Sequence, residues 1–144
     1  MKKKIALITG ASGGLGREFV ALMINEPLDE IWCVARNIQK SDGLKEQYGD
    51  KIVPLSFDLS KQESIVSIKE RIEAEQPRIA YLINNAGIGE FLGSSFTVMS
   101  IETTHEIIQL NCNAVASLCS ICIPTCVNLR GKQASERIRT LTFL

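Results

Sequence analysis

A chain of 144 residues is long enough for one domain with a hydrophobic core and too short for two domains of ordinary size. Hydrophobic residues make up 45% and charged residues 22%, a balance that excludes a disordered or fibrous protein. Sixteen basic and sixteen acidic residues cancel, so we expect neither nucleic acid nor an anionic membrane as a partner.

No secretory signal peptide is expected, because a glycine-rich segment follows the first short apolar run, and the chain is therefore expected in the cytoplasm. Its five cysteines are an odd set that we expect to be reduced thiols. Cys119 and Cys122 form a Cys-x-x-Cys pattern that could indicate a redox or zinc site. Together with Cys112 and Cys126, however, they fall close to one stripe of a helix, which favours packing. No metal site is predicted.

The first predicted unit is a strand over residues 4–9, a turn, and a helix over residues 14–25 that Pro27 ends. The turn reads Thr9-Gly10-Ala11-Ser12-Gly13-Gly14-Leu15-Gly16. Its glycines let a ligand approach the backbone, and the N–H groups that begin the helix attract a phosphate. The spacing matches neither Gly-x-Gly-x-x-Gly nor a P-loop. Such a turn can also be a plain loop, but its place after an apolar strand favours a phosphate site.

The remaining elements are predicted from apolar periodicity and capping residues. They are a strand at 30–35, a short helix and loop at 37–49, a strand at 51–57, a helix that opens at a Ser60–Glu63 capping box and closes at Pro77, a strand at 78–83, a helix that opens at a Thr103–Glu106 capping box and stops at Pro124, and a possible short strand at 138–144. Pro54 cannot donate a ladder hydrogen bond, so we expect the strand at 51–57 at the sheet margin.

Strands that alternate with helices predict an α/β fold, a three-layer, Rossmann-like doubly wound parallel sheet of about five strands. The direction of winding switches at the first strand, and ligands bind at that point in such sheets. The segment 107–128 carries no charge, as in a transmembrane helix. Its Asn, Gln and Ser residues and Pro124 instead favour a buried or oligomer-facing helix.

Arg36 lies 20 positions after Gly16. In dinucleotide-binding folds, the residue at this position contacts the adenosine ribose of the cofactor. An acidic residue there favours NAD, whereas a guanidinium pairs with the 2′-phosphate of NADP. We therefore expect NADP as cofactor, with NAD less favoured; Arg36 as a solvated surface residue is the alternative. Ser12 could add a hydroxyl contact, and Asp58 is placed for the adenine edge.

These motifs together resemble the cofactor-binding part of the short-chain dehydrogenase/reductase family. They are Thr9-Gly10-x-x-x-Gly14-x-Gly16, Arg36, Asp58-Leu59, Asn84-Asn85-Ala86-Gly87 and Asn111. The resemblance implies that Gly10, Ser12, Gly14, Leu15 and Gly16 hold the pyrophosphate and ribose of a nicotinamide dinucleotide, Arg36 its 2′-phosphate, Asp58 and Leu59 its adenine, and Asn85, Ala86 and Gly87 its nicotinamide-side ribose. It also implies that Asn111 supports the family's proton relay.

The sequence departs from the family in its catalytic pair. Hydride transfer in the family uses Tyr-x-x-x-Lys, whereas the fourth residues after Tyr48 and Tyr81 are Ile52 and Asn85. We therefore expect an NADP-dependent oxidoreductase of carbonyl or alcohol substrates by family that is inactive alone. Our hypothesis is a truncated dehydrogenase, with a dinucleotide-binding domain at 1–124 and a divergent tail at 125–144. The alternative is a non-catalytic NADP(H)-binding module or an inactive remnant. The resemblance further implies a homo-oligomer that pairs through the helix at 103–123.

Overall fold

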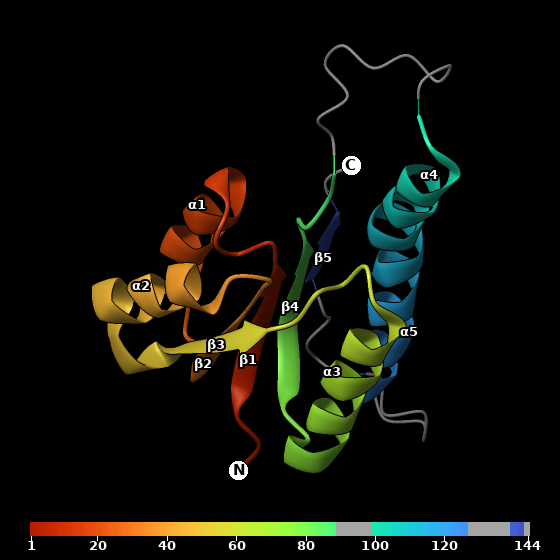
Figure 1. The fold of residues 1–144 in the computed structure, drawn as a ribbon. Coiled ribbons are helices and arrows are strands. Elements are labelled where there is room, and N and C mark those ends of the chain that lie inside the picture. The colour runs from red at the N-terminus through yellow and green to blue at the C-terminus, as the bar shows by residue number, and fades with distance from the viewer. Residues whose placement is uncertain (89–98, 127–138, 143–144) are drawn as a thin grey trace.

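The computed structural model describes residues 1–88, 99–126 and 139–142. Within them, five parallel strands form one sheet in the order β3-β2-β1-β4-β5, with helices on both faces (Figure 1). The elements are β1 (Lys4–Thr9), α1 (Gly14–Met23), β2 (Glu30–Ala35), α2 (Ile38–Tyr48), a 3-10 turn η1 (Gly49–Lys51), β3 (Ile52–Ser56), α3 (Gln62–Glu75), β4 (Arg78–Asn84), α4 (Ile101–Ile108), a π turn η2 (Gln109–Asn113), α5 (Ala114–Cys126) and β5 (Arg139–Thr142). The predicted Rossmann-like α/β fold is confirmed.

Two hydrophobic cores follow from the alternation of side chains along each strand. On β1, Ala6 and Ile8 face α1 and α2, whereas Ile5 and Leu7 face α3 and α5. All four side chains are fully buried. Because β1, β2 and β4 are covered on both faces, they are apolar almost throughout, as parallel strands usually are. Figure 1 shows the two helical layers on opposite sides of the sheet.

The centre of the sheet lies at β1, which pairs with β2 on one side and with β4 on the other. The winding therefore reverses at β1, as predicted, and the glycine turn leaves the carboxyl end of this strand. β3 lies at the edge of the sheet, which confirms the expectation drawn from Pro54.

Both predicted capping boxes are wrong. The N-cap of α3 is Lys61, without a side-chain cap, and the Ser60 hydroxyl donates to Asp58 Oδ1 at 2.7 Å because the carboxylate is the stronger acceptor. The N-cap of α4 is Ser100, whose Oγ accepts from the backbone N–H of Thr103 at 3.1 Å. The helix therefore begins before Thr103.

Pro124 does not stop the last long helix, since α5 continues to Cys126 with the proline inside its final turn. A proline there forfeits only one intrahelical hydrogen bond. The π turn was not predicted, and it changes the register between α4 and α5. Cys122 is buried and Cys119 packs against the core, as predicted, whereas Cys112 is exposed, so the prediction of a packed stripe is wrong at Cys112.

The helical run Ile101–Pro124 is long and apolar enough to cross a membrane by length and composition alone, and 22% of its most apolar window is buried. One such helix is weak evidence, because core helices of soluble proteins pass the same test. Its buried residues Leu110, Ala114, Leu118 and Cys122 pack into the core beside α3.

Candidate cofactor-binding site

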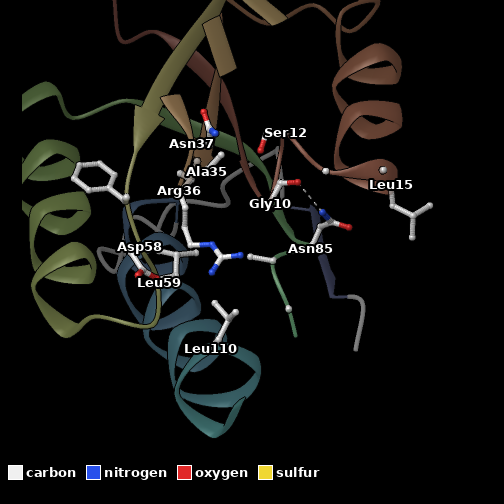
Figure 2. A pocket seen from close by; sticks show the side chains of 16 residues that line it. Gly10, Ser12, Leu15, Ala35, Arg36, Asn37, Asp58, Leu59, Asn85 and Leu110 are labelled. Carbon is white, nitrogen blue, oxygen red and sulfur yellow. Dashed lines mark hydrogen bonds between the residues drawn. The ribbon is translucent and has the colours of Figure 1, made fainter. Parts of the chain in front are cut away.

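A cavity of about 450 Å³ opens at the carboxyl ends of β1 to β4. Figure 2 shows its walls, which come from the glycine turn, the ends of β2 and β3, the segment after β4 and Leu110 in the π turn. Ten of the residues predicted from sequence line it: Gly10, Ser12, Gly14, Leu15, Arg36, Asp58, Leu59, Asn85, Ala86 and Gly87. The remaining three, Thr9, Gly16 and Asn111, are not among the lining residues.

The glycines of the turn have two different structural roles, which differ in the space around each Cα. At Gly16 a Cβ would lie 2.0 Å from the carbonyl oxygen of Gly10, so close packing of helix and turn excludes any side chain. Gly10 has φ +65°, and a Cβ there would approach Ala86 Cα to 2.9 Å. At Gly14, by contrast, a Cβ would meet nothing within 4 Å. Gly10 and Gly16 therefore build the turn, and Gly14 leaves space open beside the start of α1.

Thr9 and Asn85 join the glycine turn to the segment after β4. The buried Thr9 hydroxyl oxygen accepts from the backbone N–H groups of Asn85 and Ala86, each at 3.0 Å. The Asn85 side-chain amide donates to the carbonyl oxygens of Thr9 and Gly10, each at 3.2 Å (Figure 2 draws the bond to Gly10). Four hydrogen bonds thus hold two walls of the cavity in place.

Arg36 and Asp58 supply the charge in the cavity. Figure 2 shows the exposed Arg36 side chain reaching in beside Leu59 and Asp58. Partial burial acts to raise the pKa of Asp58, but two hydrogen bonds from Ser60 and the nearby charge of Arg36 outweigh it, so the pKa lies below its usual value. The Asp58 carboxylate is therefore ionised at neutral pH and acts as an acceptor.

Asn111 lies in the π turn and acts on the segment after β4. Its Oδ1 accepts from the backbone N–H of Ile88 at 2.9 Å, and its Nδ2 donates to the carbonyl oxygen of Ile88 at 3.0 Å. A Cβ at Gly87 would come within 3.3 Å of the same Oδ1. The side chain thus fixes the extension of β4 at the rim of the cavity, while its part in a proton relay stays a prediction.

Sequence reasoning missed six residues of the cavity wall: Gly13, Val34, Ala35, Asn37, Phe57 and Leu110. Five of them directly precede or follow a residue that was predicted, and Val34 lies two positions before Arg36, so extending each motif by one or two positions would have found them. Leu110 directly precedes Asn111, and that neighbour is its only signal, because nothing in an apolar helix distinguishes the residue that faces a ligand from those that face the core.

The cavity can bind but offers little acid or base chemistry. Among the described residues that line it, the ionisable side chains are Arg36 and Asp58. Tyr81 is directed elsewhere, since its hydroxyl donates to Glu26 Oε2 at 2.7 Å, and Tyr48 packs against the core beside α1 and α2. Neither tyrosine lines the cavity.

The chain is similar to known proteins over most of its length. A family model described as short chain dehydrogenase matches residues 4–138. Dehydrogenase/reductase SDR family member 11 from Bos taurus is 28% identical over 141 residues, which cover 94% of this chain and 52% of that protein. The NADPH-dependent 1-acyldihydroxyacetone phosphate reductase of Saccharomyces cerevisiae is 40% identical over 111 residues, 74% of this chain and 35% of that protein.

Solved structures give the same picture. A short-chain dehydrogenase from Sphingobium yanoikuyae in complex with NADPH matches with a TM-score of 0.74 and 28% identity, over 84% of this chain and 48% of that one. The chain therefore spans about half the length, or less, of these three proteins.

Proposed function

We propose that this chain, which belongs to the short-chain dehydrogenase family, binds NADP(H) in the cavity and is the cofactor-holding part of an oxidoreductase of carbonyl or alcohol substrates. The observation that carries the proposal is the position of Arg36, whose guanidinium reaches into the cavity from the end of β2. A guanidinium at this position attracts a 2′-phosphate, whereas a carboxylate would repel it. The NADPH in the Sphingobium structure and the NADPH dependence of the yeast relative support it.

The residues present fit a dinucleotide. The space beside Gly14, at the positive end of α1, suits a pyrophosphate that hydrogen-bonds to backbone N–H groups. Arg36 would pair with the 2′-phosphate, and the Asp58 carboxylate would accept from the adenine amine. Leu59 and Leu110 supply apolar surface for the base.

A bound nicotinamide would supply or accept the hydride, and this chain's own residues bind and orient it. The proton needs a separate donor or acceptor, since the sequence has no Tyr-x-x-x-Lys and neither tyrosine lines the cavity. We therefore place the acid/base pair of the proposed reaction in residues outside this sequence, in keeping with a truncated dehydrogenase whose cofactor domain covers residues 1–124. In this reading Asn111 is a positioning residue.

The same observation favours a second candidate function. A chain that binds NADP(H) without an acid/base pair is a non-catalytic nucleotide-binding module, or an inactive remnant if binding is also lost. Binding of NADPH without turnover of any carbonyl substrate, in the presence of the second half of a related enzyme, would favour the module.

Calorimetric titration of the purified chain with NADPH and NADH tests the proposal. One charge-assisted hydrogen-bonded pair at the 2′-phosphate is worth about 1.5–3 kcal/mol, so NADPH should bind about 10- to 100-fold more tightly than NADH. Equal affinity for the two would contradict the role of Arg36. No heat with either, from a sample with the far-ultraviolet circular dichroism of an α/β protein, would contradict cofactor binding.

We also propose that the chain is cytoplasmic and pairs with a second copy through α4 and α5. Ile101, Ile108 and Ile123 are 71%, 48% and 39% exposed on this helical run, which carries no charge from Ile107 to Cys126. Sedimentation should report a dimer for the wild type and a monomer for Ile108→Lys. A monomeric wild type would contradict the pairing.

A further inference from the structure

The helix α4 depends on the π turn η2 for its position. None of its eight residues is buried, and among the described elements it packs mainly against η2. Figure 1 shows α4 and α5 as successive parts of one helical run. By contrast with α4, α5 is held in the core by the buried residues Ala114, Leu118 and Cys122. A change in η2 is therefore taken up by α4 and not by α5.

The π turn is itself fixed by residues around the cofactor cavity. Leu110 is buried and lines the cavity. Asn111 forms two hydrogen bonds, of 2.9 and 3.0 Å, with the backbone of Ile88. A Cβ on Gly87, which lines the cavity, would come within 3.3 Å of Asn111 Oδ1. One turn thus contacts the cavity through two of its side chains and carries α4 at its other end.

The conformation of this turn decides which face α4 presents to its surroundings. A π turn is a rare conformation that occurs as a single turn inside α-helices, frequently at functional sites. Each residue of an α-helix adds a rotation of about 100° and a rise of about 1.5 Å, so a small change in the turn reorients the whole of α4. The exposed apolar side chains on α4 are Ile101 and Ile108, which belong to the proposed dimer interface.

We propose that the π turn couples the cofactor cavity to pairing through α4 and α5, so that bound NADP(H) strengthens the dimer. The inference rests on the proposed NADP(H) binding and on the proposed pairing. A cofactor that packs on Leu110 and on the segment held by Asn111 restricts η2, and η2 then holds Ile101 and Ile108 in place. Pairing no longer has to order α4, so it becomes more favourable. Because coupling between two sites is reciprocal, pairing strengthens NADP(H) binding by the same factor.

Sedimentation of the purified chain with and without saturating NADP⁺ tests the coupling. The dimer dissociation constant should fall about fivefold or more when the cofactor is bound, as is typical of coupled sites. Asn111→Ala removes the hydrogen bonds between η2 and Ile88, so NADP⁺ should then change the dissociation constant by less than about twofold. Asn113→Ala, at an exposed position of the same turn, is the matched control and should keep the wild-type factor.

Hydrogen exchange in the monomeric Ile108→Lys variant tests the same connection without pairing. The amide hydrogens of α4 should exchange about fivefold more slowly when NADP⁺ is bound, since the cofactor then orders α4 through η2. Addition of Asn111→Ala to this variant should abolish the difference. By reciprocity, Ile108→Lys should also bind NADP⁺ more weakly than the dimeric wild type, by the factor measured in sedimentation.

The outcomes separate the coupling from the proposed function. Calorimetric binding of NADP⁺ with an unchanged dimer dissociation constant would overturn the coupling and leave cofactor binding standing. Full coupling in Asn111→Ala would overturn the route through η2. Failure of NADP⁺ to bind to a chain shown by circular dichroism to be folded would overturn both proposals. A wild type that stays monomeric with and without NADP⁺ would overturn the pairing and the coupling, but not cofactor binding.

Discussion

The two flanks of β4 are held in different ways. Toward β1, Thr9 and Asn85 form four hydrogen bonds of 3.0 to 3.2 Å between buried or half-buried groups. Toward β5, the Asn84 amide reaches Thr142 Oγ1 at 3.5 Å, and it also reaches Cys119 Sγ of α5 at 3.7 Å. The buried Asn84 Oδ1 has no hydrogen-bond partner among the described residues, and all four residues of β5 are exposed.

This contrast shows where the fold is tightly determined. The β1 flank borders the cavity, and its four hydrogen bonds fix the positions of the Thr9 and Asn85 side chains. The β5 flank is joined by backbone pairing and a few long side-chain contacts. Substitutions should therefore be costly on the β1 flank, and equivalent substitutions on the β5 flank should cost little.

The largest effect is expected from Gly16→Ala. The added Cβ meets a backbone carbonyl oxygen at 2.0 Å, which no side-chain rotation relieves, so the free energy of unfolding should fall by about 3 kcal/mol or more. Gly14→Ala is the matched control: it enters open space within a helix and should change stability by less than about 1 kcal/mol. Urea unfolding followed by circular dichroism measures both, and equal costs would break the distinction between the two glycines.

Thr9→Val compares the flanks directly. Valine keeps the shape but removes the oxygen that accepts from two backbone N–H groups, and the expected loss is about 2–3 kcal/mol. Thr140→Val is the same change at an exposed position of β5 and should alter stability by less than about 0.5 kcal/mol. If the two variants unfold at the same urea concentration, the β1 flank is not the better-determined side.

Asn111→Ala removes both hydrogen bonds to the backbone of Ile88 and should destabilise the chain by about 1–2 kcal/mol. It should also weaken NADPH binding, because the segment it holds forms the rim of the cavity. Asn113→Ala, at an exposed position that loses only a bond to the Gln109 side chain, should cost less than about 0.5 kcal/mol. If Asn111→Ala bound NADPH as tightly as the wild type, the two hydrogen bonds between Asn111 and Ile88 would not shape the site.

The smallest effect concerns pH. The folded pKa of Asp58 lies below its ordinary value of about 3.9, so its ionised form adds stability above that pH, and the contribution is lost as pH falls further. Asp58→Asn should therefore lose less stability than the wild type between about pH 5 and pH 3.

Much of this architecture could be predicted from sequence, because strands buried on both faces are apolar runs and the glycine turn follows one of them directly. The β1 flank was predictable for that reason. Helix starts were not, because a hydroxyl such as that of Ser60 has several acceptors within reach and the sequence does not rank them. The π turn was also missed, since one extra residue in an apolar helix leaves no periodic signal. Leu110 reaches the cavity through that turn.

The most direct test of the central claim is a cycle of four titrations, NADPH and NADH against the wild type and Arg36→Asp. A carboxylate at the end of β2 repels a 2′-phosphate and accepts from a ribose hydroxyl, so the preference should invert. We predict that the wild type binds NADPH more tightly, and that Arg36→Asp loses NADPH while keeping or gaining NADH. Equal loss of both cofactors in a folded Arg36→Asp, or no change in either, would contradict the assignment of Arg36 to the 2′-phosphate.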